Sequence, residues 1–333
     1  MDVLYLVIPC YNEEEVLLET KKRLKIKFNS LIKNKKVSKN SKVFFVDDGS
    51  KDQTWNLITL FNKEDCLFSG IKLSRNMGHQ NALMAGLMTV KDLADFVITM
   101  DCDLQDDIEV IDQFIEEYKK GNDIVYGVRN SREKDTFFKR NSAILLYKLM
   151  NKFGVEIVYN HADYRLMSKR AIKSLSQFKE VNLFLRGLVP LLGYNYSTVE
   201  YRREARYAGK TKYPLKKMFN FAIDGVTSFT IKPIRFITML GFFIFFVSLC
   251  MLIYTLIRHF NGETIVGWSS VMVSVWAIGG LQLLAIGVIG EYIGKIYMET
   301  KARPKYIIEQ NLCIEKKKWL ISFFHIIFKK IYN

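Results

Sequence analysis

The chain lacks the signatures of several large protein classes. Its five cysteines form no C-x-x-C pair and are odd in number, which excludes a disulfide scaffold or a zinc ribbon and fits a reducing compartment. It has no G-x-x-x-x-G-K-[ST] phosphate loop, no G-x-G-x-x-G after the first expected strand and no G-x-S-x-G nucleophile elbow. The four histidines show no metal-like spacing, and His79 is interpreted as a loop residue rather than a metal ligand.

The N-terminus also lacks a basic segment ahead of an apolar one. Asp2 is followed by a short apolar run that ends at Pro9, so a signal peptide is not expected. The 333 residues are 49% hydrophobic and 25% charged, which excludes a disordered or collagen-like chain. That length provides material for one large domain or two ordinary ones.

Positive charge is in excess. Lys and Arg number 49 and Asp and Glu 34, so the formal net charge is 49 − 34 = +15. Such an excess indicates a polyanionic partner, and three classes stay open: nucleic acid, an anionic membrane surface and a phosphorylated substrate.

Residues 1 to about 213 have the pattern of an α/β domain. Short β-rich runs alternate with amphipathic stretches of helix length, at residues 3–9, 42–47, 71–74, 96–101 and 123–128. This alternation predicts strand–helix–strand units and a mainly parallel sheet covered on both faces. Ligands bind such sheets at the carboxyl ends of the strands, where this sequence has its unusual polar clusters.

Two long uncharged runs follow this domain. Residues 236–257 and 264–290 form runs of 22 and 27 residues without a charged side chain. About 20 apolar residues suffice to span a membrane, so residues 236–290 predict a transmembrane hairpin, with buried soluble helices as the alternative. Small residues such as Gly279 and Gly280 favour close helix packing, and a homo-oligomer stays open.

The charges that flank the hairpin predict its orientation. Residues 201–235 hold nine Lys or Arg against two acids, and residues 291–333 hold nine against four. The loop between the two runs offers Arg258, opposed by Glu263. Because positive residues stay on the cytoplasmic side, we expect a multi-pass membrane protein with the α/β domain and both termini in the cytoplasm.

Two further segments are expected to lie on the lipid bilayer surface. Residues 214–235 repeat apolar side chains at helical spacing. Residues 319–328, within the basic tail 291–333, are apolar but too short to span and are bracketed by lysines. Both patterns predict interfacial helices anchored by anionic lipid, with core-packing helices as the alternative.

Polar clusters end the first two expected strands. Pro9, Tyr11 and Glu13 end or follow the first, where an aromatic ring and polar groups can bind a flat heterocycle, although Pro-x-x-Asn also makes ordinary turns. Asp47 and Asp48 end the second. Helix capping explains the Ser, Asp and Thr residues that come next. It does not explain the two adjacent carboxylates, whose mutual repulsion indicates a ligand.

A D-x-D sequence ends the fourth expected strand. Asp101 and Asp103 are two positions apart, so in an extended chain they point to the same side, and Gln105 reaches that side as well. Mg²⁺ or Mn²⁺ held by one or two carboxylates keeps positions open for substrate phosphates. The pattern therefore predicts a metal site, although D-x-D also occurs by chance.

Cationic residues follow the fifth expected strand and precede the hairpin. They are Arg129, Arg140, Arg202, Arg206, Lys210 and Lys212. Guanidinium and ammonium groups suit phosphate oxygens, so these residues are candidates for binding phosphate. For residues 202–212, adhesion to an anionic membrane is the alternative.

Seven short motifs occur in order along the chain, and their combination resembles one enzyme family. They are P-x-Y-N-E, V-D-D-G-S-x-D-x-T, S-R-N-x-G-H-Q-x-A-L-x-A-G-L, D-x-D-L-Q, G-V-R, A-D-Y-R-L-M and the basic stretch 206–213. Over residues 3–213 the chain resembles the family 2 glycosyltransferases of GT-A (Rossmann-like) fold, specifically the polyprenyl-phosphate sugar transferases. Its hairpin resembles the bactoprenol glucosyltransferase branch. The family often has Pro after D-L-Q, where this chain has Asp106.

The resemblance implies inverting transfer of a sugar from a nucleotide sugar to undecaprenyl phosphate at a bacterial inner membrane. UDP-glucose is the first expected donor, then UDP-GlcNAc or UDP-galactose. The alternative is transfer from GDP-mannose, as in dolichyl-phosphate mannose synthases. A membrane-tethered nucleic-acid-binding module is the alternative from another class. It is disfavoured because the basic residues crowd the membrane border.

The resemblance also implies roles for individual residues. The nucleoside would be held by Pro9, Tyr11, Glu13 and Asp48, with Asp47 beside them. A metal ion on the diphosphate would be held by Asp101, Asp103 and Gln105. Donor or acceptor phosphates would be met by Arg129, Arg140, Arg206 and Lys212, with Arg202 and Lys210 in the same cluster.

Asp163 is the candidate base or orienting carboxylate by the same resemblance. A phosphate monoester acceptor has a second pKa of about 6, so at neutral pH it is mostly a dianion and needs no strong general base. We therefore expect Asp163 to orient Arg165 or the acceptor phosphate, with proton removal secondary. The alternative is that Asp163 caps the helix expected around residues 168–174.

Overall fold

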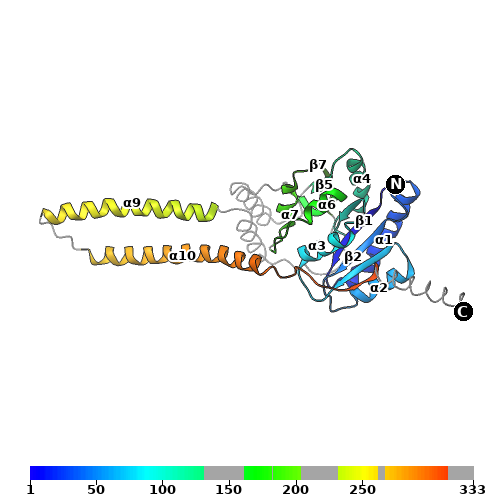
Figure 1. Ribbon diagram of the computed structural model, residues 1–333, viewed down its shortest axis with the longest axis horizontal. Coiled ribbons are helices and arrows are strands. Elements are labelled where there is room, and N and C mark those ends of the chain that lie inside the picture. Colours follow the sequence, from blue (N-terminus) through cyan, green and yellow to red (C-terminus); the bar gives the residue numbers. More distant parts are fainter. Residues whose placement is uncertain (131–160, 182, 204–231, 262–266, 314–333) are drawn as a thin grey trace, which may run out of the picture. The chain divides into compact units, whose positions relative to one another are not determined.

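The computed structural model spans residues 1–333 and describes all of them except 131–160, 182, 204–231, 262–266 and 314–333. The chain divides into two compact units, and Figure 1 labels many of their elements. The sheet unit comprises residues 1–147, 156–213 and 304–333. The helical unit comprises residues 148–155 and 214–303.

The sheet unit is built on one eight-stranded sheet. The strands are β1 (Leu4–Cys10), β2 (Lys42–Asp47), β3 (Phe68–Leu73), β4 (Phe96–Thr99), β5 (Ile124–Arg129), β6 (His161–Ser168), β7 (Tyr196–Tyr201) and β8 (Ile308–Asn311). Their order is β7-β5-β6-β4-β1-β2-β3-β8. Neighbours are parallel except where β6 or β8 takes part. The mainly parallel α/β sheet predicted from the sequence is confirmed.

The central strands are unbroken apolar runs. All of β1 and all of β2 except its first residue are buried, as is typical of a parallel sheet with helices on both faces. β2 has the bounds predicted from the sequence. β3 begins at Phe68 rather than at residue 71, and β4 ends at Thr99 rather than at residue 101.

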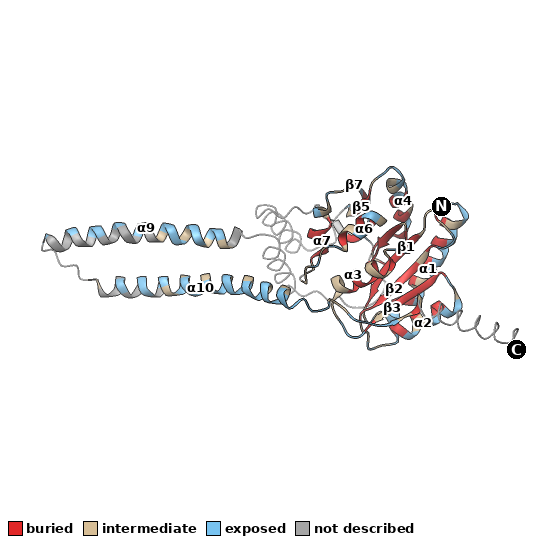
Figure 2. Cartoon of the chain, viewed as in Figure 1, coloured by how far each residue is buried: buried red, intermediate tan, exposed pale blue. Residues whose placement is uncertain are grey.

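Helices cover both faces of the sheet. They are α1 (Glu14–Lys33), α2 (Thr54–Glu64), α3 (His79–Val90), η1 (Ile108–Val110), α4 (Ile111–Lys119), α6 (Lys169–Leu175), α7 (Leu185–Leu188) and η2 (Pro190–Leu192). Apolar side chains of α1, α2 and α4 form one core with Leu6, Phe45 and Ile98. On the other face, α3 packs against Val7 and Val46. The central strands are therefore buried between two helical layers (Figure 2).

A glycine lets α3 approach the sheet closely. A Cβ atom on Gly86 would lie 2.5 Å from Val7 Cγ1 and 2.7 Å from Val46 Cγ2, closer than packed carbon atoms tolerate. Gly86 belongs to the same sequence motif as Gly78, which precedes the first turn of α3. The motif therefore sets how α3 packs, and with it the position of His79 in that first turn.

Three strands correspond to no predicted run. β6 lies antiparallel between β4 and β5, β7 pairs with β5, and β8 pairs antiparallel with β3. β8 comes from residues 291–333, which the sequence indicated as a basic tail. In β8, Gln310 Oε1 accepts a hydrogen bond from Trp55 Nε1 of α2 at 2.8 Å. Part of the tail is thus an edge strand of the sheet.

The described part of the helical unit contains two helices that contact each other, α9 (Lys232–Phe260) and α10 (Trp268–Lys301). α9 contains the first uncharged run, and α10 contains residues 268–290 of the second. Within the described ranges, one segment, Ala277–Lys301, is long and apolar enough to cross a membrane, and Ile234–Ile244 is a shorter apolar segment. Length and composition thus support one membrane span in the described residues, and the two-span hairpin stays a prediction.

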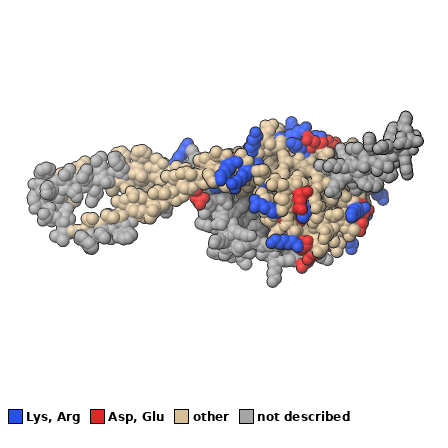
Figure 3. Space-filling model, turned by 60° about the horizontal axis from the view of Figure 1, so that its bottom comes forward, with Lys and Arg blue, Asp and Glu red and all other residues tan. Residues whose placement is uncertain are grey.

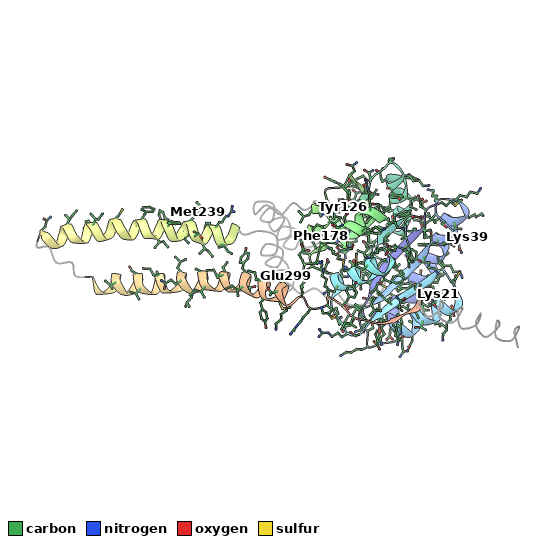
Figure 4. All side chains as sticks on the ribbon, viewed as in Figure 1. Lys21, Lys39, Tyr126, Phe178, Met239 and Glu299 are labelled. Carbon is green, nitrogen blue, oxygen red and sulfur yellow. The ribbon has the colours of Figure 1, made fainter. Side chains whose placement is uncertain are left out.

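Large apolar side chains lie on the outside of both helices. Met239 on α9 and Leu283 on α10 are each 72% exposed. The two helices show mainly uncharged surface in Figure 3, and the side chain of Met239 stands out from α9 in Figure 4. An apolar surface of this extent indicates contact with lipid or protein.

Several predictions concern residues outside the described ranges. Arg140, Arg206, Lys210 and Lys212 lie there, as do residues 319–328 and most of 214–235, where interfacial helices are expected. These remain predictions.

Candidate active site

One edge of the sheet brings together most of the predicted site residues. β1, β2, β4 and β5 run the same way, so their carboxyl ends meet at this edge. β6 begins there because it runs antiparallel to β4 and β5. Asp47 and Arg129 are the last residues of their strands, and Pro9 is the last but one of β1. Asp101 follows β4, and Asp163 lies near the beginning of β6. This edge is where parallel α/β sheets bind ligands.

Hydrogen bonds join the loops that follow β1 and β2. The backbone N–H of Asn12 donates to Ser50 Oγ at 3.0 Å, and Asn12 Oδ1 accepts the N–H of Lys51 at 2.9 Å. Asn12 has a φ of 51°, a left-handed conformation that Asn adopts more readily than most residues. The loop that carries Tyr11 and Glu13 is therefore braced by its neighbour.

Asp47 and Asp48 are used by the fold itself. Asp48 accepts the backbone N–H of Met77 at 2.7 Å and that of Gly78 at 3.0 Å, and Asp47 accepts the N–H of Ser50 at 3.4 Å. Burial raises the pKa of both carboxyl groups, and these hydrogen bonds oppose the rise. Backbone donors thus give the two adjacent acids a structural role within the fold. Nucleoside binding by them remains a prediction.

The D-x-D sequence forms a turn rather than an extended strand. β4 ends before Asp101, and Leu104 has a φ of 56°, so the alternation of an extended chain does not apply here. Asp103 Oδ1 accepts the backbone N–H of Gln105 at 3.2 Å, and the side-chain oxygen of Gln105 accepts from Arg203. The geometric reason for placing three ligands on one side is therefore wrong.

Asp101 and Asp103 nevertheless fit a metal ion. Burial raises the pKa of Asp101, His79 opposes this effect, and the charges of Asp103 and Asp163 add to it. A divalent cation would relieve that repulsion, and Mg²⁺ or Mn²⁺ prefers such oxygen ligands. Within the described ranges, no group of three or more His, Cys, Asp or Glu is arranged to hold a metal. Two carboxylates suffice where phosphate oxygens complete the site.

His79 lies between two of the acids. Its Nε2 atom is 3.6 Å from Asp101 Oδ1 and 3.5 Å from Asp163 Oδ2. Burial would lower the pKa of His79, but these two carboxylates raise it above its ordinary value. The residue begins α3, directly after the backbone that Asp48 holds. The interpretation of His79 as a loop residue is corrected: it links the D-x-D turn to β6.

Asp163 contacts two arginines as well as His79. Its Oδ1 accepts from Arg165 Nη2 at 2.6 Å and its Oδ2 from Arg186 Nη2 at 3.0 Å. Arg165 is fully buried beside it. Burial alone would raise the pKa of Asp163, but Arg186, His79 and Arg165 hold it well below the ordinary value. The carboxylate is therefore ionised and weakly basic.

The alternative role of Asp163 as a helix cap is wrong. The hydroxyl of Ser168 caps α6, accepting the backbone N–H of Ala171 at 3.2 Å. Asp163 lies within β6, where the hydroxyl of Thr99 donates to its backbone carbonyl. Its side chain is thus left for the cations.

Sequence reasoning missed two of these site residues. His79 stands in one of the seven sequence motifs, but the partners of its side chain become visible only in the fold. Arg186 carries no sequence signal, because it lies in the four-residue helix α7. The neighbouring Leu185 donates its N–H to Gln80 Oε1 at 3.0 Å, which docks α7 beside the first turn of α3.

Two of the predicted phosphate-binding cations lie within the described ranges. Arg129 ends β5, and its Nε donates to the hydroxyl of Tyr201 at 3.3 Å. Burial raises the pKa of Asp101 and the charge of Arg129 opposes this rise, so Arg129 belongs to the same edge of the sheet. Arg202 follows β7 and is exposed.

The sequence matches two protein families. Residues 5–176 match glycosyl transferase family 2. Residues 232–296 match the family described as the GtrB C-terminal hairpin. The first match extends from β1 through α6, and the second covers α9 and most of α10.

Several similar proteins match nearly the whole chain. "Uncharacterized glycosyltransferase YkoT" of Bacillus subtilis (strain 168) is 52% identical over 94% of this chain and 93% of its own length. The bactoprenol glucosyl transferase of Shigella phage SfII is 40% identical over 92% of this chain and 97% of its own. The prophage bactoprenol glucosyl transferase homolog of Escherichia coli (strain K12) is 39% identical over 92% and 98%.

Proposed function

The chain belongs to glycosyl transferase family 2, and from that premise we propose that it transfers glucose from UDP-glucose to undecaprenyl phosphate with inversion. The observation that carries this proposal is the match to relatives named bactoprenol glucosyl transferase, which covers 92% of the chain at 39 and 40% identity. That match includes both the sheet unit and the helical unit. A lipid-linked acceptor explains why a sugar transferase carries long apolar helices. GDP-mannose is the alternative donor.

The nucleoside of the donor is assigned to the ends of β1 and β2, near Pro9, Tyr11 and Glu13. The brace between the two loops supports this assignment, because a loop whose backbone is held in advance loses little entropy when its side chains bind a base. Asp47 and Asp48 would act there mainly through the backbone that they hold.

The diphosphate leaving group is assigned to the neighbouring ends of β4 and β5. Negative charge builds on it during the displacement, and Arg129 is the described cation that ends β5. Asp101 and Asp103 would hold Mg²⁺ or Mn²⁺, which supplies further positive charge to the leaving group when bound. Gln105 is a weaker candidate because its oxygen already accepts from Arg203.

The acceptor phosphate is assigned to cations around Asp163 and ahead of the helical unit. Further candidates come from the sequence alone: Arg140, Arg202, Arg206, Lys210 and Lys212. The phosphate is mostly a dianion at neutral pH, so its oxygen attacks the anomeric carbon without first losing a proton. The new carbon–oxygen bond forms as the bond to the diphosphate breaks on the opposite side, which inverts the centre.

Asp163 is proposed to orient cations rather than to remove a proton. Its low pKa supports this role, because a weakly basic carboxylate is a poor proton acceptor. Its contacts with Arg186 and His79 would hold these two side chains, each about one-third exposed or less, towards the attacking phosphate.

The helical unit is proposed to anchor the chain in the inner membrane, with the sheet unit in the cytoplasm. The span Ala277–Lys301 and the exposed apolar side chains of α9 and α10 support the anchor. The Lys and Arg excess on both flanks of the helices supports the orientation.

A hairpin in which α9 and α10 both cross the membrane, as the two uncharged runs predict, has an outward-facing loop after α9. A cysteine placed at Asn261, in a chain whose own cysteines are replaced, should react with an impermeant maleimide in intact cells. A cysteine placed at Asn40, in the sheet unit, should react only after the membrane is permeabilised. Labelling of the Asn261 site only after permeabilisation would contradict the topology.

The activity itself is tested with membranes that contain the full chain. They are incubated with undecaprenyl phosphate and, in turn, with labelled UDP-glucose, UDP-GlcNAc, UDP-galactose and GDP-mannose. We expect a labelled lipid from UDP-glucose that requires added undecaprenyl phosphate. Product from GDP-mannose alone would favour the alternative donor, and no lipid product from any of the four would overturn the proposal.

A further inference from the structure

Asp106 is a buried acid with unused hydrogen-bonding capacity. It is 4% exposed, and its Oδ1 accepts the hydroxyl of Tyr201 at 2.6 Å. Its Oδ2 is buried and has no hydrogen-bond partner among the residues that the structure describes. A buried carboxylate in this state costs free energy unless a nearby charge compensates it. The Pro that the family often has at this position would avoid that cost.

The compensating charge is that of Arg129. The Tyr201 hydroxyl that donates to Asp106 also accepts from Arg129 Nε at 3.3 Å. Arg129 and Tyr201 are partners across β5 and β7. The hydroxyl therefore connects the acid after the D-x-D turn to the cation that ends β5.

Other contacts already hold the backbone around Asp106. The Tyr164 hydroxyl donates to the backbone carbonyl of Asp107 at 3.0 Å, and Arg203 donates to Gln105. The rings of Tyr164 and Tyr201 pack edge to face, with centroids 5.3 Å apart. The turn is thus tied to β6 and to the end of β7 without the Asp106 carboxylate, which is left to act on Tyr201 and Arg129.

We propose that Asp106 is a positioning residue: through the Tyr201 hydroxyl, it holds the Arg129 guanidinium where the diphosphate of the donor binds. The inference rests on the proposed function, because it takes the ligand of Arg129 to be a nucleoside diphosphate. An arginine side chain that is held in advance loses less conformational entropy on binding. The benefit therefore appears in nucleotide affinity.

The test measures the affinity of UDP for the purified full chain in detergent, by calorimetry at constant Mg²⁺. Asp106→Ala and Tyr201→Phe should each weaken UDP binding about tenfold, the change expected when a hydrogen bond to a charged group is lost. In an Arg129→Ala background, Asp106→Ala should cause no further loss, because the residue through which it acts is gone. Asp106→Asn keeps an acceptor for Tyr201 and should recover part of the affinity.

Tyr164→Phe is the matched control. It removes a buried tyrosine hydroxyl from the same cluster, but one that bonds a backbone carbonyl, so UDP affinity should stay within about twofold. If Asp106→Ala does not fold, Asp106→Asn and Tyr201→Phe, each combined with Arg129→Ala, give the same comparison.

Three results would overturn the inference. The first is that the losses of UDP affinity from Asp106→Ala and Arg129→Ala add in the double variant. The second is that Tyr164→Phe weakens UDP binding as much as Tyr201→Phe does. The third is that the wild-type chain binds neither UDP nor GDP. If the wild type binds GDP more tightly than UDP, GDP is the probe. A chain that shows the expected nucleotide pattern but transfers no sugar to undecaprenyl phosphate would count against the proposed function alone.

Discussion

The acids at the end of β2 and those at the junction of β4 and β6 look alike in the sequence but are held differently. Asp47 and Asp48 accept backbone N–H groups. Asp101 and Asp163 face the imidazole of His79, and Asp163 also binds two arginines. Backbone donors shape a loop, whereas side-chain cations can turn towards a ligand. The partners of the acids, rather than the acids themselves, distinguish the two regions.

The pKa shifts follow the same division only in part. The pKa of Asp48 and that of Asp101 are both raised, chiefly by burial. Their ionised forms are disfavoured in the folded chain, so their contribution to stability falls as pH rises through the folded-state pKa. The pKa of Asp163 is depressed. Its contribution to stability is present above the unfolded-state value and is lost as pH falls.

The largest effect is expected at the β4–β6 junction. Asp101→Asn should lower the transfer rate about a thousandfold, as loss of a major electrostatic group does, without lowering the melting temperature. Asp103→Ala should do the same, because both are assigned to the metal. Rates and melting curves in detergent test this.

The control for these variants lies in the same loop. Asp107 caps η1 by accepting the N–H of Glu109 at 2.9 Å, and Asn caps equally well, so Asp107→Asn should keep its activity. Full activity of Asp103→Ala in excess chelator would contradict the assignment of Asp101 and Asp103 to a metal ion that activity requires.

Asp163→Asn should lower the rate about a hundredfold, at the lower end of what one preorganised electrostatic group contributes. Because Asp163 is not expected to remove a proton, raising the pH from 6 to 8 should not restore activity to this variant. The substitution should also lower the melting temperature, since Arg165 loses its buried counter-charge. Recovery of near wild-type turnover at pH 8 would show that proton removal was its role.

Asp123 offers a matched acid away from this edge. It is buried and binds Arg170 and Ser168. Asp123→Asn should lower the melting temperature but leave the transfer rate near that of the wild type, which separates loss of a buried ion pair from loss of catalysis.

His79→Ala should lower the rate about tenfold, in the range of one lost hydrogen bond to a charged group. The side chain bridges Asp101 and Asp163, so combining the change with Asp163→Asn should give less than the product of the two losses. An unchanged rate in the single variant would mean that the bridge has no role in turnover.

The smallest effect on turnover is expected at β2. Asp48→Asn should cost about 1 kcal/mol of stability, because one partly buried backbone N–H loses its acceptor. The Michaelis constant for the donor should rise a few-fold while kcat stays nearly constant. A large loss of kcat at unchanged melting temperature would erase the distinction between the two regions.

The central strands could be predicted because they are apolar runs between polar turns. β2 has the predicted bounds for that reason. β6 could not be predicted, because it carries polar and charged residues along its length. The buried guanidinium of Arg165 is tolerated there only beside Asp163, a pairing that no local pattern indicates. β8 is short and mostly exposed, so it leaves no hydrophobic signal either.

The sequence by itself determined the family, the mainly parallel sheet and which acids end its strands, because ordered motifs and apolar runs are local properties. Only the tertiary structure decided which acids serve the backbone and which face His79, Arg186 or Tyr201. These partners are far apart in the chain and meet because β6 runs against β4 and β7 pairs with β5. A hydrogen bond depends on positions that strand order and register set, and those follow from packing of the whole sheet.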